Sequence, residues 1–140
     1  MAVLKKDPHV DPEHIAAIGY CFGGGVALAM ARAGEDLDAV VTFHGELATE
    51  HPAKKGMVHA RILVNTGGAD PFVPPKQVKA FEQEMKAAGA DSRVIVYSGA
   101  KHSFTNPDAG SYGMEQLAYD KDADQKSWAA MLKLFQQVFR

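Results

Sequence analysis

Cysteine is scarce in this sequence: Cys21 is the only one among 140 residues, so the chain has no internal disulfide. Basic residues are not in excess, with 15 Lys and Arg against 17 Asp and Glu. That balance leaves no basic footprint for nucleic acid and no polybasic membrane anchor. The chain also lacks an apolar run long enough to span a membrane, and residues 1–10 have no apolar signal core. We therefore expect a cytoplasmic protein, in a reducing compartment that suits a reactive thiol.

Metal-binding patterns are missing as well. The six histidines include no HExxH pair, and none has paired cysteines near it. The sequence therefore predicts no metal and no cofactor. We expect His9, His14, His51 and His59 to lie on the surface.

Apolar runs alternate with helical patterns along the chain. The apolar runs are continuous, as expected for strands buried on both faces of a parallel sheet, and they occupy residues 15–19, 39–43, 62–66 and 94–97. The helical patterns cover residues 23–33, 75–89 and 123–139. No repeat or linker divides the chain. The alternation predicts one α/β domain over residues 1–140, with a mostly parallel sheet of about four strands flanked by helices.

The last helical pattern carries an apolar stripe that we assign to core packing. The stripe consists of Trp128, Met131, Leu132, Phe135 and Val138. Two irregular stretches remain, residues 44–60 and 103–122. Loops of that length in a compact domain are often functional or mobile.

Cys21 lies in a short segment of special composition, Gly19-Tyr20-Cys21-Phe22-Gly23-Gly24. An apolar run precedes it and an alanine-rich run follows it. Strand, tight glycine turn and helix in that order indicate a nucleophile elbow, with cysteine where serine is usual. Such a turn is too sharp for side chains beside the nucleophile, and Gly19 and Gly23 meet that need. The alternative is an inert buried thiol, which is what a lone cysteine most often is.

Two further residues follow strand ends. Asp70 comes after the third predicted strand and His102 after the fourth. The chain order of nucleophile, acid and histidine is that of the α/β-hydrolase fold. Because the carboxyl ends of parallel strands share one edge of the sheet, Cys21, Asp70 and His102 are expected to meet there. Taken separately, Asp70 before a proline is also a good turn former, and His102 is one of six histidines.

These residue types fit nucleophilic catalysis. A free thiol is only a few per cent thiolate at neutral pH, and a helix start and a neighbouring imidazolium favour the thiolate. His102 can take the thiol proton and later give it to the leaving alkoxide. Asp70 can hold the imidazole in one tautomer and stabilise its charged form. The backbone N–H of Phe22, directly after the nucleophile, can donate to the oxyanion.

Four runs of residues together resemble the dienelactone hydrolase family. They are Ile18-Gly19-Tyr20-Cys21-Phe22-Gly23-Gly24, Phe43-His44-Gly45, Gly68-Ala69-Asp70-Pro71-Phe72-Val73-Pro74 and His102-Ser103-Phe104-Thr105-Asn106-Pro107. The resemblance covers nearly the whole chain. Members are α/β-hydrolases that open lactones or cleave esters with a Cys-His-Asp triad, through an acyl-thioester intermediate. The resemblance implies that the chain is the C-terminal half of an α/β-hydrolase fold and acts on a small ester or lactone. It also implies that Cys21 is the nucleophile, Asp70 the acid and His102 the base.

The residues that flank the motifs are candidates for the substrate pocket. They are Tyr20, His44, Phe72, Phe104 and Asn106. Asn106 marks a departure from the family pattern, because dienelactone hydrolase itself has an arginine there that binds the substrate carboxylate. Asn106 supplies no such charge, so a dienelactone is not the expected substrate.

The position of the elbow is a second departure. Family members are typically much longer, with the elbow near their middle, whereas here it comes at residue 21. The resemblance therefore implies that the N-terminal half of the fold is absent, together with the loop that supplies the second oxyanion donor. The strand from Ile15 to Gly19 would then be a sheet edge beside an apolar patch. We predict a homodimer joined across or near this edge, since two-fold pairing closes most simply.

Two classes of function fit these observations. The first is a carboxylic-ester or lactone hydrolase that uses Cys21, His102 and Asp70. The second is a non-catalytic or weakly active half-domain that serves as an assembly or binding module and keeps the triad by descent. Losing one oxyanion donor typically costs ~10²–10³ in kcat, which weakens activity without abolishing it. A redox-sensing thiol is less favoured, because the chain has no resolving cysteine.

Overall fold

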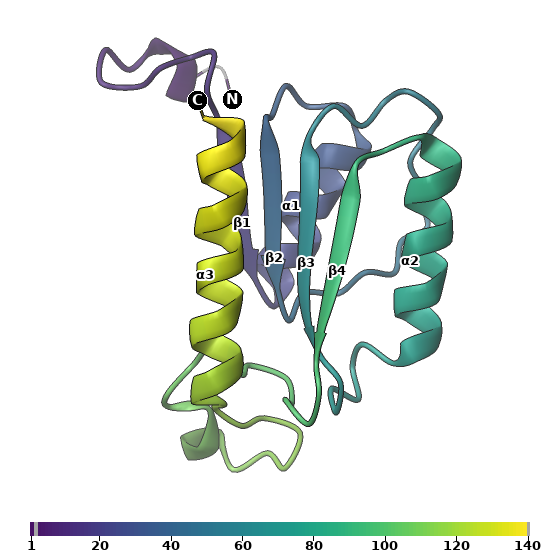
Figure 1. Cartoon of the computed structure of the whole chain (residues 1–140), viewed down its shortest axis with the longest axis vertical. Helices are drawn as coiled ribbons and strands as arrows, with labels where there is room; N and C mark the ends of the chain where they lie inside the picture. Colours follow the sequence, from purple (N-terminus) through teal and green to yellow (C-terminus); the bar gives the residue numbers. More distant parts are fainter. Residues whose placement is uncertain (2, 140) are drawn as a thin grey trace.

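The computed structural model describes residue 1 and residues 3–139. Strands and helices alternate along this part of the chain (Figure 1). In chain order the elements are η1 (Leu4–Lys6), β1 (Ala16–Tyr20), α1 (Phe22–Arg32), β2 (Ala39–Phe43), β3 (Arg61–Gly67), α2 (Pro75–Ala88), β4 (Ser92–Tyr97), η2 (Ala109–Tyr112) and α3 (Lys121–Val138). Each predicted strand and helix is present, and its ends lie within a few residues of the predicted ones.

The strands form one parallel sheet in the order β1-β2-β3-β4. β2 is buried along its whole length, as expected for a strand with helices on both faces of the sheet. Helices α1 and α2 lie on one face and α3 on the other (Figure 1). The predicted fold class is therefore confirmed, and the carboxyl ends of all four strands reach one edge, where open α/β sheets bind their ligands.

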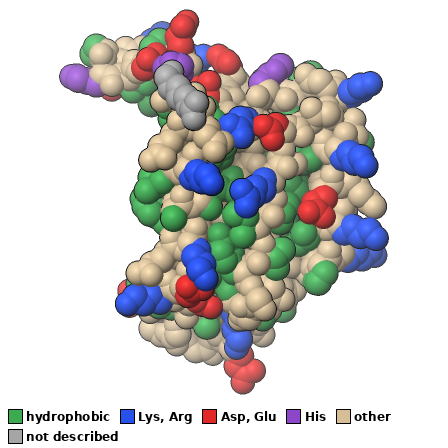
Figure 2. All heavy atoms as spheres, in the orientation of Figure 1, with side chains coloured by type: hydrophobic (Ala, Val, Ile, Leu, Met, Phe, Trp, Pro, Cys, Tyr) green, Lys and Arg blue, Asp and Glu red, His purple; other side chains and the backbone are tan. Residues whose placement is uncertain are grey.

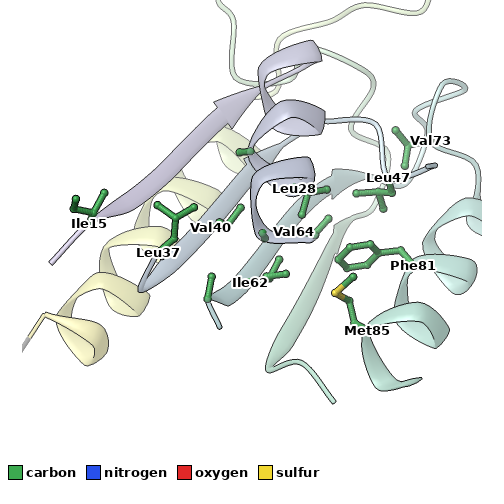
Figure 3. Packing of buried hydrophobic residues seen from close by; sticks show 13 residues of the cluster. Ile15, Leu28, Leu37, Val40, Leu47, Ile62, Val64, Val73, Phe81 and Met85 are labelled. Atoms are coloured by element: carbon green, nitrogen blue, oxygen red, sulfur yellow. The ribbon is translucent and has the colours of Figure 1, made fainter. Parts of the chain in front are cut away.

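The main core fills the space between the sheet and the two helices α1 and α2. Figure 3 shows Leu28 of α1 and Phe81 of α2 directed toward the sheet. Adjacent residues of β2 face opposite ways: Val40 packs into this core, whereas Val41 packs on the α3 side. Within the strand, successive side chains thus point to the two faces of the sheet in turn.

Hydrogen bonds fix the irregular segment between β2 and β3, residues 44–60. Arg32 of α1 makes a two-point ion pair with Glu84 of α2, with N···O distances of 2.8 and 2.9 Å. The same guanidinium donates to the carbonyl of Leu47 at 2.7 Å, and Glu84 accepts from the N–H of Ala53 at 2.8 Å. Two helices thus hold a loop that passes beside the carboxyl end of the sheet.

The apolar stripe of α3 is only partly core, contrary to the prediction from its spacing. Met131 is 2% exposed, but Trp128 and Leu132 remain 46% and 44% exposed. The reason is that α3 packs over Val41 and Phe43 of β2. The flank of the helix that carries Trp128 and Leu132 therefore stays in solvent.

A hollow of about 340 Å³ lies on the opposite flank of α3, toward β3 and β4. Figure 2 shows apolar surface beside α3 with Lys and Arg side chains around it. The lining combines apolar residues with basic ones, among them Leu63, Ile95, Leu134, Arg93 and Lys133. The helix therefore covers only the middle of this face of the sheet.

β1 is an edge strand, because β2 is its only neighbour in the sheet of the described residues. Its residues Ile18 and Tyr20 are 46% and 41% exposed. A free edge beside exposed apolar side chains favours pairing with another chain. The homodimer expected from the sequence stays a prediction.

We expect the purified protein to have the mass of a dimer by multi-angle light scattering at micromolar concentration. Ile18→Lys should shift it toward the monomer, because a charge on an edge strand opposes edge-to-edge pairing. Met114→Lys is the matched control, since Met114 is an equally exposed apolar residue of a loop. A monomeric mass for the unchanged protein would contradict the prediction.

Candidate active site

Cys21 forms the sharp turn between β1 and α1. Its backbone has a φ of 50° and a ψ of −122°, a conformation that residues with side chains seldom adopt. Its N–H donates to the carbonyl of Phe43 at 3.0 Å, which extends the ladder with β2 by one residue. Because α1 begins at the next residue, the thiol stands exposed at the end of the sheet. This is the geometry of a nucleophile elbow.

The glycines around the elbow differ in what they permit. A Cβ at position 19 would lie 2.1 Å from the carbonyl oxygen of Gly23, so the close approach of strand and helix requires Gly19. A Cβ at position 23 would meet nothing within 4 Å. The expectation that both positions must be glycine is therefore wrong for Gly23. Its backbone, not its missing side chain, is what approaches Gly19.

The structure brings the three predicted catalytic side chains together in a chain of hydrogen bonds. Nε2 of His102 lies 3.1 Å from Sγ of Cys21. Nδ1 of the same ring lies 2.8 Å from Oδ2 of Asp70. Asp70 is an acceptor when ionised, so Nδ1 carries a proton and Nε2 is left to accept one from the thiol.

Local turns hold Asp70 and His102 in place. Asp70 lies just after β3, its side chain is fully buried, and its Oδ1 accepts from the N–H of Phe72 at 2.9 Å. His102 forms a short parallel bridge with Leu117. Its N–H donates to the carbonyl of Gln116, and its carbonyl accepts from the N–H of Ala118. The loop of residues 103–120 therefore packs back onto the backbone of His102.

The surroundings shift the pKa of His102 upward. The hydrogen bond that His102 donates to Asp70 is the largest cause, burial opposes it, and the contact with Cys21 adds to the rise. The charged imidazolium is thus favoured beside the thiol. Because this folded-state pKa lies above the unfolded one, His102 stabilises the fold below pH 6.5, and that contribution is lost as the pH rises through the folded-state pKa.

His44 behaves in the opposite way. Burial and repulsion from His102 lower the pKa of His44 to about 4, although Asp70 acts in the other direction. The unfolded chain binds a proton at this residue near pH 6.5, whereas the folded chain does so only near pH 4. Acidification through that interval therefore destabilises the fold, by about 3 kcal/mol at its lower end.

A cavity of about 410 Å³ opens at the thiol. It is lined by Cys21, Phe22, Glu46, Phe72, Val73 and His102. The first N–H groups of a helix have no partner within the helix, so the N–H of Phe22 at the start of α1 is available to a ligand oxygen in this cavity. Glu46 is the only carboxylate among these lining residues.

Of the five candidate pocket residues, only Phe72 lines this cavity. Tyr20 stacks on Phe43 with 4.7 Å between ring centroids. His44 and Phe104 are 3% and 0% exposed; His44 packs against the rings of His102 and Phe104, and neither residue lines the cavity. Asn106 is in a turn, where its side chain accepts from the N–H of Asp108.

Sequence reasoning missed Glu46 and Val73. Glu46 follows β2 by three residues, and Val73 follows Asp70 by three. Their positions in the chain could have identified them, because both lie in segments that leave the carboxyl end of a strand. No local pattern shows that these two residues line the same cavity as the thiol, because the cavity brings together segments far apart in sequence.

No helix among the described residues is both long and apolar enough to cross a membrane. Residues 1 and 3–139 contain no group of three or more His, Cys, Asp or Glu side chains arranged to hold a metal ion.

Comparison with known proteins gives consistent relatives. The family model of the dienelactone hydrolase family matches residues 1–139. An uncharacterized protein of Caenorhabditis elegans is 35% identical over 138 residues, which are 97% of this chain and 87% of that protein. A candidate carboxymethylenebutenolidase of Yersinia pestis is 30% identical over 135 residues, 91% of this chain and 48% of the relative.

A crystal structure with high similarity is that of a dienelactone hydrolase-like promiscuous phosphotriesterase from metagenomic libraries. It shares 42% identity and a TM-score of 0.92, over 98% of this chain and 57% of that one. The chain thus spans about half the length of this enzyme and of the Yersinia relative. The match of the family model over almost every residue shows that the chain belongs to the dienelactone hydrolase family.

Proposed function

We propose that this protein hydrolyses carboxylic esters or lactones through an acyl-thioester on Cys21. The observation that carries the proposal is the continuous hydrogen-bond chain from the exposed thiol through His102 to the buried Asp70. Family membership supports the same class of reaction. No metal or cofactor enters the mechanism, because the side chains themselves provide nucleophile, base and acid.

The mechanism follows from the atoms in contact. His102 Nε2 takes the thiol proton, and the thiolate sulfur attacks the ester carbonyl carbon. The resulting oxyanion lies near the start of α1, where the N–H of Phe22 can donate to it. The C–O bond then breaks, and Nε2 gives the proton to the leaving alkoxide. Water, deprotonated by the same nitrogen, attacks the thioester and releases the acid and the thiol.

Asp70 acts without giving up its charge. The hydrogen bond that it accepts from Nδ1 keeps the ring in the tautomer that presents a free Nε2 to sulfur, and it stabilises the imidazolium formed in each proton transfer.

The test of the proposal is thiol-dependent hydrolysis of a small activated ester such as p-nitrophenyl acetate. A purified protein that hydrolyses no ester or lactone would leave the half-domain module as the better description.

The cavity lining adds a preference for uncharged substrates. Glu46 places a carboxylate beside the thiol, and neither lysine nor arginine is among the lining residues of the described chain. An ester that carries its own carboxylate is therefore repelled. The metagenomic relative is called a phosphotriesterase, and phosphotriesters are uncharged, which agrees with this preference.

We expect Glu46→Gln to raise kcat/KM for mono-p-nitrophenyl succinate about 2–5-fold, the range of an exposed charge interaction. Hydrolysis of p-nitrophenyl butyrate, which has similar length and no charge, should stay within experimental error. Glu50→Gln is the control, because Glu50 is an exposed carboxylate of the same loop that does not line the cavity. Equal effects of the Glu46 change on both esters would contradict the role.

A further inference from the structure

His44 is a buried titratable residue that the proposed mechanism does not use. It directly follows β2, is 3% exposed and has a φ of 41°, in the left-handed region. Its N–H donates to the carbonyl of Asn65 at 2.8 Å, which continues the ladder with β3 past the end of the strand. Backbone pairing thus fixes an unfavourable conformation, and the side chain points toward His102 and the loop that follows it.

The imidazole of His44 contacts that loop in two ways. Its Nε2 lies 2.8 Å from Oγ1 of Thr105. Its ring packs edge-on against the ring of His102, with 5.2 Å between centroids and an interplanar angle of 66°. A second edge-on contact, also at 5.2 Å, joins it to Phe104. One side chain therefore holds the catalytic ring and the turn that carries it.

The hydrogen bonds select one neutral form of His44. Nδ1 is buried and has no partner among the described residues. A buried acceptor left unpaired is tolerated better than a buried donor, so the proton belongs on Nε2, which donates to Thr105. A neutral ring also adds no charge that would oppose the imidazolium of His102. The ionisable groups facing His44 are His102, Asp70 and, more remotely, Tyr20.

We propose that His44 is a positioning residue: through Thr105 and ring packing it holds His102 within hydrogen-bond reach of the Cys21 thiol. Four groups surround the ring of His102, and each fixes it from a different side. Asp70 binds its Nδ1, the thiol lies at its Nε2, Phe72 packs edge-on at 5.1 Å, and His44 packs from another side. This inference rests on the proposed hydrolase function, but part of its test does not require substrate.

The decisive variant is Thr105→Val, which keeps the shape of the side chain and removes its hydrogen bond to His44. We expect kcat for p-nitrophenyl acetate to fall roughly 10-fold or more, because small misplacement of a catalytic group costs up to ~10² in rate. KM should change less than about twofold, since Thr105 does not line the cavity. Thr105→Ser restores the hydroxyl and should recover most of kcat. His44→Asn tolerates the left-handed backbone but is too short to reach Thr105, and should resemble Thr105→Val.

A second readout separates positioning from simple loss of stability. The rate of alkylation of Cys21 by iodoacetamide, measured as a function of pH, reports the reactivity of the thiol. Alkylation near neutral pH should be slower in Thr105→Val, when His102 no longer contacts the sulfur. Ser111→Ala is the matched control, because it also removes one side-chain hydrogen bond of the same loop, to the carbonyl of Asp108, and Ser111 is an exposed residue that does not line the cavity. Its alkylation profile should equal that of the unchanged protein.

Two results would overturn the proposal. The first is a Thr105→Val protein whose alkylation profile and kcat match the unchanged protein. The second is a Thr105→Ser protein as impaired as Thr105→Val, which would make the side-chain volume, not the hydrogen bond, the important property. If the unchanged protein hydrolyses no ester, the proposed function fails, and the alkylation profile alone decides whether His44 and Thr105 position His102.

Discussion

Replacing Cys21 with alanine is expected to reduce hydrolysis of p-nitrophenyl acetate by at least ~10⁴-fold in kcat, and His102→Ala should do nearly the same. Residues of a hydrolytic triad act as a unit, so removing the nucleophile or its base alone costs about as much as removing both. The double variant should therefore be no slower than either single one. Initial rates with purified, folded proteins measure this result.

A matched control distinguishes the catalytic histidine from histidines in general. His51 is exposed and lies outside the cavity, so His51→Ala should keep full activity.

The rate at which the Cys21 thiol is alkylated gives a second check. Since Asp70 raises the pKa of His102, the imidazolium persists above pH 6.5 and favours thiolate beside it. Cys21 in His102→Ala should therefore be alkylated more slowly at neutral pH. Undiminished hydrolysis by Cys21→Ala would refute the proposed function.

The second large effect concerns the fold. We expect Gly19→Ala to lower the free energy of unfolding by ~3 kcal/mol or more, because its Cβ would lie 2.1 Å from one backbone atom of α1 and 2.3 Å from another. Backbone atoms cannot move aside as a flexible side chain can, so β1 and α1 must separate. In thermal denaturation this change corresponds to a fall in Tm of roughly 10 °C.

Gly23→Ala is the internal control for that experiment. The added methyl group would meet nothing within 4 Å, and alanine is a better helix former than glycine by about 0.5–1 kcal/mol. Its Tm should therefore equal or exceed that of the unchanged protein. Comparable losses for the two variants would mean that glycine is needed throughout the elbow for flexibility, not at position 19 for close approach.

Strands and helices were predictable because their signals are local. The apolar run of β2 and the helix from Pro75 to Gly89 can be read from a few neighbouring residues, and both have nearly the predicted ends. The contact among Cys21, His102 and Asp70 was predictable for a related reason. Parallel strands bring their carboxyl ends together, so Cys21, Asp70 and His102 needed only to follow strands in order.

The remaining features depend on which side of an element faces the rest of the molecule. The spacing of Trp128 and Leu132 is that of a core stripe, but α3 packs on β2 and β3 with another side, and these two residues stay in solvent. His44 ends a strand like a pocket residue, yet it packs against the ring of His102 and does not line the cavity. The bond between Arg32 and Glu84 joins residues far apart in sequence, and no local pattern contains it.

The strand order has a consequence for synthesis of the protein. Each strand pairs with the one made just before it, so the sheet can grow as the chain emerges from the ribosome, N-terminal end first. Cys21 follows the first strand of this sheet, whereas His102 comes 81 residues later in the chain. During synthesis the thiol therefore emerges 81 residues before the imidazole that contacts it. The contact between the two side chains can form only once the residues that follow β4 have been made.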